Sequence, residues 1–299
     1  MVNHSVVSVR SWLFTPATRP DRLLSAAGKG VDLSIADLED SVVAEQKAVA
    51  RDKLRTLLDS AANPLLPRLA VRINSTFTRF GLDDLVALLD ASRAPDFILL
   101  PKIESPEQVV QIATLFDQAG KACALVPMIE SARGLAAVES IASAGPRIAA
   151  LMFGAADYAS DVRAHSDALA LQVARCRVAA AAASAGIKAI DAPCFAIHDA
   201  ELLQADLAFA VANGFHGKAA IHPSHIPSIN RAFTPSADRV AWAKRVLEAN
   251  EQGAGIVDGR MVDEAIAREA RGVLTATRAS STFLGEHHEF DYFRVSPDR

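Results

Sequence analysis

Several acidic residues of this sequence lie at or just after the ends of apolar stretches, where side chains able to bind a metal or move protons often lie. Glu130 and Asp157 each come after a strongly apolar run, and Glu39 and Asp40 end the tetrapeptide DLED at 37–40. Carboxylates gathered in one place raise each other's pKa and resist joint ionisation, so a cation is their simplest partner. The sequence has no clustered Cys or His ligands for zinc. It therefore indicates an all-oxygen site for Mg²⁺ or Mn²⁺, in which Mg²⁺ takes one or two carboxylates together with water and substrate.

Basic residues occupy comparable positions. Arg72 lies at the end of one apolar run and Lys102 follows another. Lys102 is a candidate substrate-binding residue, and a salt bridge within the fold is the alternative. Each of the acids Glu104 and Asp40 is also compatible with a purely structural role, as a helix N-cap or an ion-pair partner.

Other reactive side chains give weaker signals. His222 and His225 have the HxxH spacing, but Pro223 argues against a regular helix that would align both imidazoles on a metal, so packing is favoured. Cys194 has no evident neighbouring base and is interpreted as an inert thiol.

The segments that carry these residues repeat one pattern: a short β-rich apolar run, polar residues, and then a longer stretch of helical periodicity. Strands are predicted at 11–15, 33–36, 68–72, 97–100, 124–128, 148–153, 188–192 and 219–222. Helices are predicted at 19–28, 45–60, 82–91, 106–119, 134–144, 167–185, 199–212 and 225–232. Strict alternation implies a parallel sheet, and eight repeats favour a closed (β/α)₈ TIM barrel, whose chemistry gathers at the carboxyl ends of the strands.

The repeat ends near residue 233, so the expected organisation is a catalytic barrel at 1–233, a C-terminal helical extension at 234–278 and a flexible tail at 279–299. The extension is predicted to contain helices at 235–251 and 261–277, joined by a glycine-rich turn.

Composition narrows the class of protein. The chain has 299 residues, a net charge of −4 and no long Lys/Arg run, which argues against a nucleic-acid partner. No apolar run is long enough to span a bilayer and the N-terminus lacks a signal-peptide core, so no membrane partner and a cytoplasmic location are expected. The three cysteines show no zinc spacing and are expected to be reduced.

Nine segments together resemble the citrate lyase β-subunit and HpcH/HpaI aldolase superfamily, from about residue 10 to 277. They are RSWLFTPATRPDR (10–22), ADLEDSVVAEQKAVAR (36–51), VRIN (71–74), LLPKIES (99–105), PMIESARG (127–134), FGAADYASD (153–161), GKAAIHPSH (217–225), FTPSADRVAWAKRVL (233–247) and DGRMVDEA (258–265). Nine segments in order, at barrel-compatible spacing, point to the family more strongly than to one substrate.

The resemblance implies site roles. Glu130 and Asp157 would be Mg²⁺ ligands, and Glu39 and Asp40 would steady the metal-bound waters. Arg72 would lie beside the metal and stabilise negative charge on a thioester enolate.

Further roles follow from the same resemblance. Arg19 and Arg22 would face the phosphates or pantetheine arm of coenzyme A or of an acyl carrier protein, although Arg22 is also compatible with a solvent-facing position. Asp263 would handle a proton in a neighbouring subunit's site, within a homotrimer or a hexamer built as a dimer of trimers.

The implied reaction is the reversible cleavage of a small 3-hydroxyacyl-CoA, of the citramalyl-, malyl- or citryl-CoA type, to an acetyl thioester and a 2-oxo acid. One alternative is a class II pyruvate-type aldolase acting on a free 4-hydroxy-2-oxo acid. Another is a β-subunit that is active only in a citrate lyase complex with an acyl carrier protein.

Overall fold

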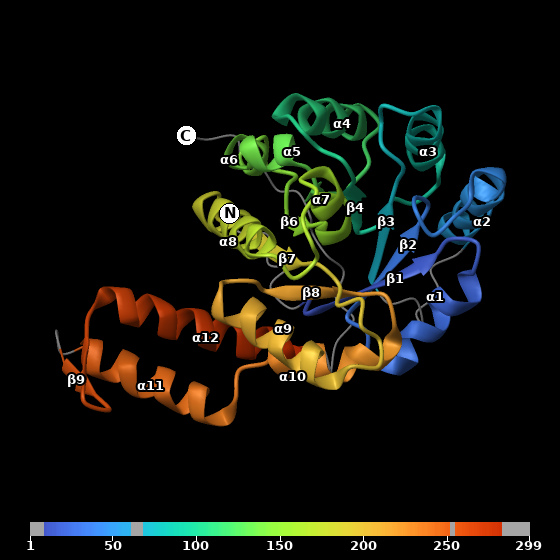
Figure 1. Cartoon of the computed structure of the whole chain (residues 1–299). Coiled ribbons are helices and arrows are strands. Elements are labelled where there is room, and N and C mark those ends of the chain that lie inside the picture. Colours follow the sequence, from blue (N-terminus) through green and yellow to red (C-terminus); the bar gives the residue numbers. More distant parts are fainter. Residues whose placement is uncertain (1–8, 61–67, 252–254, 283–299) are drawn as a thin grey trace.

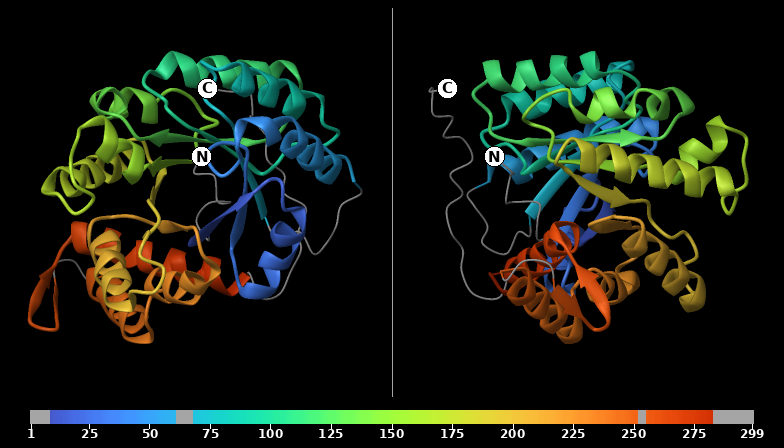
Figure 2. Two further views of the ribbon diagram at one scale, coloured as in Figure 1. Left: turned by 45° about the vertical axis from the view of Figure 1, so that its right-hand side comes forward. Right: turned by 90° about the vertical axis from the view of Figure 1, so that its left-hand side faces the viewer.

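The computed structural model describes residues 9–60, 68–251 and 255–282. Eight parallel strands pair in sequence order and close where β1 meets β8 (Figures 1 and 2). They are β1 (Ser11–Pro16), β2 (Leu33–Asp37), β3 (Arg68–Arg72), β4 (Phe97–Leu100), β5 (Ala124–Ile129), β6 (Ala150–Phe153), β7 (Lys188–Asp191) and β8 (Gly217–Ala220). The predicted closed barrel is confirmed. β8 begins and ends two residues earlier than predicted, so His222 lies beyond the strand.

Helices surround this barrel (Figure 2). They are α1 (Pro20–Ala26), α2 (Lys47–Asp59), α3 (Arg79–Asp90), α4 (Pro106–Gln118), α5 (Ala132–Ala136), α6 (Val138–Ala142), α7 (Ala155–Asp161), α8 (Leu169–Ser184), α9 (Ala200–Ala212) and α10 (Ile226–Ala232), with 3₁₀ turns η1 (Ala27–Lys29), η2 (Ala44–Gln46) and η3 (Pro223–His225).

The helices differ from the prediction in two places. The single helix expected at 134–144 is divided into α5 and α6, because Ala137 leaves helical geometry at φ −101°, ψ 8°. The short helix α7 was not predicted. It begins after Gly154 without a side-chain cap, so the sequence carries no start signal for it.

The interior of the barrel is filled by inward-facing apolar side chains. Trp12 and Phe97 lie with their ring centroids 5.4 Å apart and share one buried cluster with Leu33, Ile35 and Val126. A second, larger cluster contains outward-facing strand residues and the helices that cover them. The barrel is therefore a packed scaffold that holds its strand ends rigidly.

The C-terminal extension contains α11 (Ala237–Glu251), β9 (Gly255–Val257), β10 (Arg260–Val262) and α12 (Glu264–Thr282). It lies beyond α9 and α10 and has its own small apolar core (Figure 1). The predicted glycine-rich turn is instead a two-stranded hairpin. Its tight turn holds Asp258 and Gly259 at φ +50° and +76°, as a two-residue type I′ turn requires. Helix α12 continues past residue 279, where the tail was predicted to begin, and residues 283–299 lie outside the described part.

None of the helices described between residues 9 and 282 is long and apolar enough to cross a bilayer.

Candidate active site

The two predicted metal ligands come from neighbouring strands. Glu130 directly follows β5, and Asp157 lies in the first turn of α7, just after β6. A Cβ atom at Gly154 would lie 2.4 Å from Glu130 Oε2, so glycine at this position is what allows the carboxylate to lie against the start of α7. Asp157 is near enough to raise the pKa of Glu130 electrostatically. The fold thus brings these two acids together.

Glu130 is a buried carboxyl group in an unfavourable electrostatic environment. Its side chain is buried, and Oε1 accepts a hydrogen bond of 2.7 Å from the backbone N–H of Lys102. Oε2 is also buried but has no hydrogen-bond partner among the described residues. Burial, together with repulsion from Glu39 and Asp157, raises the pKa of Glu130 from 4.5 to about 8. A cation beside Oε2 would satisfy this oxygen and favour the ionised form.

Arg72 is held in one orientation by several groups. Its Nε and Nη2 donate to the two carboxylate oxygens of Asp37, both at 2.7 Å. Its Nη1 lies 3.0 Å from a carboxylate oxygen of Glu39, and the guanidinium carbon lies 4.7 Å from the centroid of the Phe14 ring. Although burial opposes the charge, the hydrogen bonds that Arg72 donates to Asp37 and the charges of the nearby acids raise the pKa of Arg72 above its ordinary value. Arg72 is a fixed cation at the mouth of the barrel.

The other two acids of the DLED segment have different environments. Glu39 is buried between Arg72 and the Lys102 ammonium, whose Nζ donates to it at 2.9 Å. Burial is the main reason that the pKa of Glu39 is raised. Asp40 is 58% exposed and approaches Arg72 only at 3.6 Å. The structure therefore places Glu39 inside the site and Asp40 at its rim.

Lys102 takes part in the site through both its backbone and its side chain. Its φ of +55° lies in the left-handed region, where a non-glycine residue is uncommon. In that conformation its N–H reaches Glu130 while its ammonium reaches Glu39. Lys102 thus links the acids of β2 and β5, and the salt bridge considered from the sequence is present.

The two arginines of the RPDR segment, Arg19 and Arg22, lie in different environments. Arg22 lines a cavity of about 380 Å³ at the carboxyl ends of β1 and β8, together with Lys29, His222 and Phe14. Arg19 does not line this cavity; it forms a 2.8 Å ion pair with Asp21, and both side chains are largely exposed. Lys29 was not singled out from the sequence, because a lone lysine near a helix end is an ordinary surface residue.

Asp263 serves a local role within the chain. Its carboxylate accepts a hydrogen bond of 3.0 Å from the Ile266 N–H and so caps α12. Among the described residues, no contact joins Asp263 to Arg72, Glu130 or Asp157.

The remaining candidates from the sequence make structural contacts. His225 is buried, with Nε2 3.2 Å from the carbonyl oxygen of Ile197, and His222 Nδ1 accepts from the Ser224 N–H at 3.2 Å. Cys194 is a buried free thiol. Glu104 accepts a hydrogen bond of 2.8 Å from the Ser131 hydroxyl.

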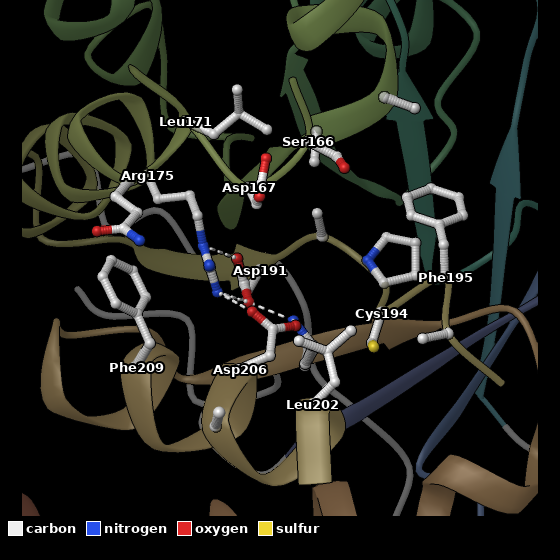
Figure 3. A pocket seen from close by; sticks show the side chains of 18 of the residues that line it. Ser166, Asp167, Leu171, Arg175, Asp191, Cys194, Phe195, Leu202, Asp206 and Phe209 are labelled. Atoms are coloured by element: carbon white, nitrogen blue, oxygen red, sulfur yellow. Dashed lines mark hydrogen bonds and ion pairs between the residues drawn. The ribbon is translucent and has the colours of Figure 1, made fainter. Parts of the chain in front are cut away.

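A cavity of about 640 Å³ is lined by residues of α8 and α9 and of the segment after β7 (Figure 3). Its floor is a buried charge network in which Arg175 and Lys218 pair with Asp191 and Asp206. Two cations and two acids balance each other there. This cavity contains none of the predicted site residues, so volume alone does not identify the active site.

The donor set near Glu130 suits a hard divalent cation. Within residues 9–60, 68–251 and 255–282, no group of three or more His, Cys, Asp or Glu residues is arranged to hold a metal. The two carboxylates of Glu130 and Asp157, with a buried Glu130 Oε2 that has no partner in the described part of the chain, match Mg²⁺, which keeps several waters.

Two residues that matter to the site were not predicted to take part in it. Asp37, the first acid of DLED, is the bidentate partner of Arg72. Gly154 provides the space that Glu130 occupies. A polar residue at the end of a buried strand was a visible signal for Asp37, whereas nothing in the sequence marks the close approach at Gly154.

This chain is similar in sequence to one described family and to several known proteins. The family described as HpcH/HpaI aldolase/citrate lyase matches residues 10–223. A citrate lyase subunit beta-like protein of Mycobacterium tuberculosis H37Rv is 38% identical over 88% of this chain and 93% of its own length. A (3S)-malyl-CoA thioesterase of Cereibacter sphaeroides ATCC 17025 is 33% identical over 94% of this chain and 98% of its own length.

Two further comparisons extend this result. Mitochondrial citramalyl-CoA lyase of Homo sapiens is 28% identical over 91% of this chain and 86% of its own length. The crystal structure of the protein CitE from Mycobacterium tuberculosis in complex with magnesium, acetoacetate and coenzyme A is similar with a TM-score of 0.77. It shares 35% sequence identity and covers 91% of this chain and 98% of that chain.

Proposed function

Because this chain belongs to the HpcH/HpaI aldolase/citrate lyase family, we propose that it is a Mg²⁺-dependent carbon–carbon lyase acting on a small 3-hydroxyacyl-CoA. The products are an acetyl thioester and a 2-oxo acid. The observation that carries this proposal is the buried Oε2 of Glu130, which lies near Asp157 and has no hydrogen-bond partner among the residues that the structure describes. The same mouth of the barrel contains the fixed cation Arg72. The names of the relatives and the magnesium and coenzyme A of the similar crystal structure support it.

In this proposal, Glu130 and Asp157 hold Mg²⁺, and Glu39 orients groups around it. Bound Mg²⁺ supplies a Lewis acid that neutralises these carboxylates and favours the carbonyl form of the 2-oxo acid. For the thioester fragment, the cation is a side chain of the protein itself, Arg72. When the C2–C3 bond of the 3-hydroxyacyl thioester breaks, the C3 hydroxyl gives up its proton and becomes the carbonyl of the 2-oxo acid. The electron pair of the broken bond becomes a thioester enolate, and Arg72 stabilises that negative charge. Protonation of the enolate at carbon then gives the acetyl thioester.

Arg72 suits this task because it is already oriented before substrate binds. Three of its contacts are with Asp37 and Glu39, at 2.7–3.0 Å, so little reorganisation is needed as charge develops. Its guanidinium cannot lose its proton in a protein, so it acts as an electrostatic group and not as an acid.

Coenzyme A is proposed to bind in the 380 Å³ cavity lined by Arg22, Lys29 and His222. Guanidinium and ammonium groups suit phosphate, and the cavity opens at the end of β1, next to Phe14 and therefore next to Arg72. Arg19, which pairs with Asp21 in solvent, is the weaker candidate of the two arginines.

The proton is proposed to be handled by Asp263 of a second copy in a homotrimer or hexamer. Ile256 and Met261, on the hairpin just before Asp263, are 77% and 70% exposed, and such apolar side chains suit a contact with another subunit. Mixing Asp263→Asn protein with Arg72→Ala protein, each expected to be strongly impaired but measurable on its own, tests this directly. Activity is expected to return in mixed oligomers, because each then contains some sites with both groups intact. Activity that stays absent in verified mixed oligomers, or an Asp263→Asn variant with full turnover, would refute the trans role.

The experiment that tests the function uses the purified chain with Mg²⁺ and three substrates: citramalyl-CoA, malyl-CoA and a free 4-hydroxy-2-oxo acid. Cleavage of a thioester, loss of activity with EDTA and its recovery with Mg²⁺ are expected. Cleavage of the free oxo acid alone would favour the pyruvate-type aldolase. If the chain is inert until an acyl carrier protein is added, the complex-subunit alternative holds. We also propose a cytoplasmic location, on the sequence grounds given above.

A further inference from the structure

We propose that Asp37 is a positioning residue for the lyase reaction, whose carboxylate fixes the Arg72 guanidinium and the loop carrying Glu39 as a single unit. This inference rests on the proposed function, because the reaction is the context in which the position of Arg72 matters.

The first support is the place of Asp37 in the barrel. It is the last residue of β2, its side chain is 1% exposed, and its Cα partner across the β2–β3 ladder is Arg72. Two opposite charges at paired positions of adjacent strands are held by backbone hydrogen bonds on both sides. The geometry of the pair is therefore set by the most rigid part of the protein.

The second support is that each carboxylate oxygen of Asp37 accepts two hydrogen bonds, one from Arg72 and one from the backbone after β2. Oδ1 accepts from Arg72 Nε at 2.7 Å and from the Glu39 N–H at 2.9 Å. Oδ2 accepts from Arg72 Nη2 at 2.7 Å and from the Ser41 N–H at 3.2 Å. One carboxylate thus determines both where the guanidinium lies and how the chain turns after β2.

Because Asp37 binds two of the three guanidinium nitrogens of Arg72, it also determines the direction of the third, Nη1. With Nε and Nη2 occupied by Asp37, Nη1 faces Glu39 at 3.0 Å and the rim at Asp40. Asp37 itself does not face this opening, since its oxygens are used by Arg72 and by backbone amides. It is therefore expected to act through Arg72 and not on substrate.

An amide at this position cannot replace the carboxylate. Asparagine has one acceptor oxygen, and its NH₂ group would face a guanidinium N–H, donor against donor. Arg72 keeps its charge but loses its two-point attachment, and it is then free to turn toward Glu39 and Asp40. A displacement of about 1 Å in such a group lowers turnover roughly 100-fold.

The chain provides a matched control at Asp191. This residue ends β7, is 0% exposed, and also accepts two hydrogen bonds from one arginine, at 3.0 and 2.6 Å from Arg175 (Figure 3). It lies on the floor of the 640 Å³ cavity and contacts neither Arg72 nor Glu130 in the described structure. Asp191→Asn thus disrupts a similar buried arginine–carboxylate pair in the same barrel, together with the contact of Asp191 to Lys218.

The experiment compares Asp37→Asn, Asp191→Asn, Arg72→Ala and the double variant Asp37→Asn/Arg72→Ala in kcat, KM and Mg²⁺ affinity. For Asp37→Asn we expect kcat to fall about 100-fold, with KM and Mg²⁺ affinity little changed. Asp191→Asn should lower the melting temperature but leave kcat unchanged. In the Arg72→Ala background, Asp37→Asn should cost no further activity, because residues that act as one unit are not additive.

Three results would overturn the inference: wild-type kcat in folded Asp37→Asn, full additivity in the double variant, or an equal loss of kcat in Asp191→Asn. If Asp37→Asn does not fold, Asp37→Glu keeps the charge but moves the carboxylate by one methylene. A folded Asp37→Glu protein with wild-type kcat would then refute the positioning role. If the unaltered protein cleaves no thioester, the proposed function fails instead, and the two failures are distinguishable.

Discussion

Replacing Gly154 with alanine is the most direct perturbation of the proposed metal site. The added Cβ would lie 2.4 Å from Glu130 Oε2 and 2.5 Å from Glu130 Cβ, whereas ordinary contact begins at 3.4 Å. The Glu130 side chain or the backbone must therefore move by about 1 Å. Backbone conformation is not the obstacle, because φ at Gly154 is −104°, which alanine tolerates.

The magnitude follows from that displacement. Metal–ligand distances tolerate only about 0.2 Å, so Mg²⁺ affinity should fall. A misplacement of 1 Å near the reacting groups lowers kcat/KM about 100-fold, equivalent to roughly 2.7 kcal/mol of transition-state stabilisation. Crowding a packed position also costs about 1–3 kcal/mol of folding stability.

The assay measures thioester cleavage across a Mg²⁺ titration, Mg²⁺ binding by calorimetry, and the melting temperature. Gly145→Ala is the matched control, since its Cβ would meet nothing within 4 Å and its φ is not positive. It should leave activity unchanged and alter stability by less than about 1 kcal/mol. A folded Gly154→Ala protein with unchanged kcat/KM and Mg²⁺ affinity would refute the placement of Glu130 in the metal site.

Three other predictions concern pH and the coenzyme A cavity. Since the pKa of Glu130 is about 8 against an ordinary 4.5, the metal-free folded protein keeps a proton that the unfolded chain has lost, so its stability falls as pH rises through this window. Stabilisation by Mg²⁺ in thermal melts should therefore grow from pH 6 to 8, and Glu130→Gln should abolish it. Burial lowers the pKa of His216 to about 4 from 6.5, so the unfolded chain gains a proton first as pH falls and stability is lost between these values. Urea unfolding at pH 7 and pH 5 should show that His216→Asn loses less free energy of unfolding between these pH values than the unaltered protein does. An equal loss in the two proteins would contradict the assignment of this pH dependence to His216. Arg22→Ala should raise KM for the thioester about tenfold with kcat unchanged, the effect of one charge-assisted hydrogen bond, whereas the exposed Arg19→Ala should not; equal KM values in both variants would contradict the cavity assignment.

Much of the fold could be predicted because the barrel is repetitive. Apolar runs of strand length alternating with helical periodicity recur eight times, and each repeat is readable locally. The C-terminal hairpin was missed although its Asp258-Gly259 pair is a strong signal for a two-residue turn. Helix α7 was missed because it is short and lacks a capping side chain. Local signals were sufficient where the segment was long and periodic.

The sequence by itself determined which residues stand at strand ends, and so it identified Glu130, Asp157, Glu39 and Arg72 as one group at the mouth of a barrel. The carboxyl ends of parallel strands must meet, and that requirement needs no coordinates. Only the tertiary structure decided which of these side chains touch. The β2–β3 register places Asp37 opposite Arg72, and the path of the following loop turns Glu39 inward and Asp40 toward solvent. Register and loop path depend on contacts between segments distant in sequence, so no local pattern records them.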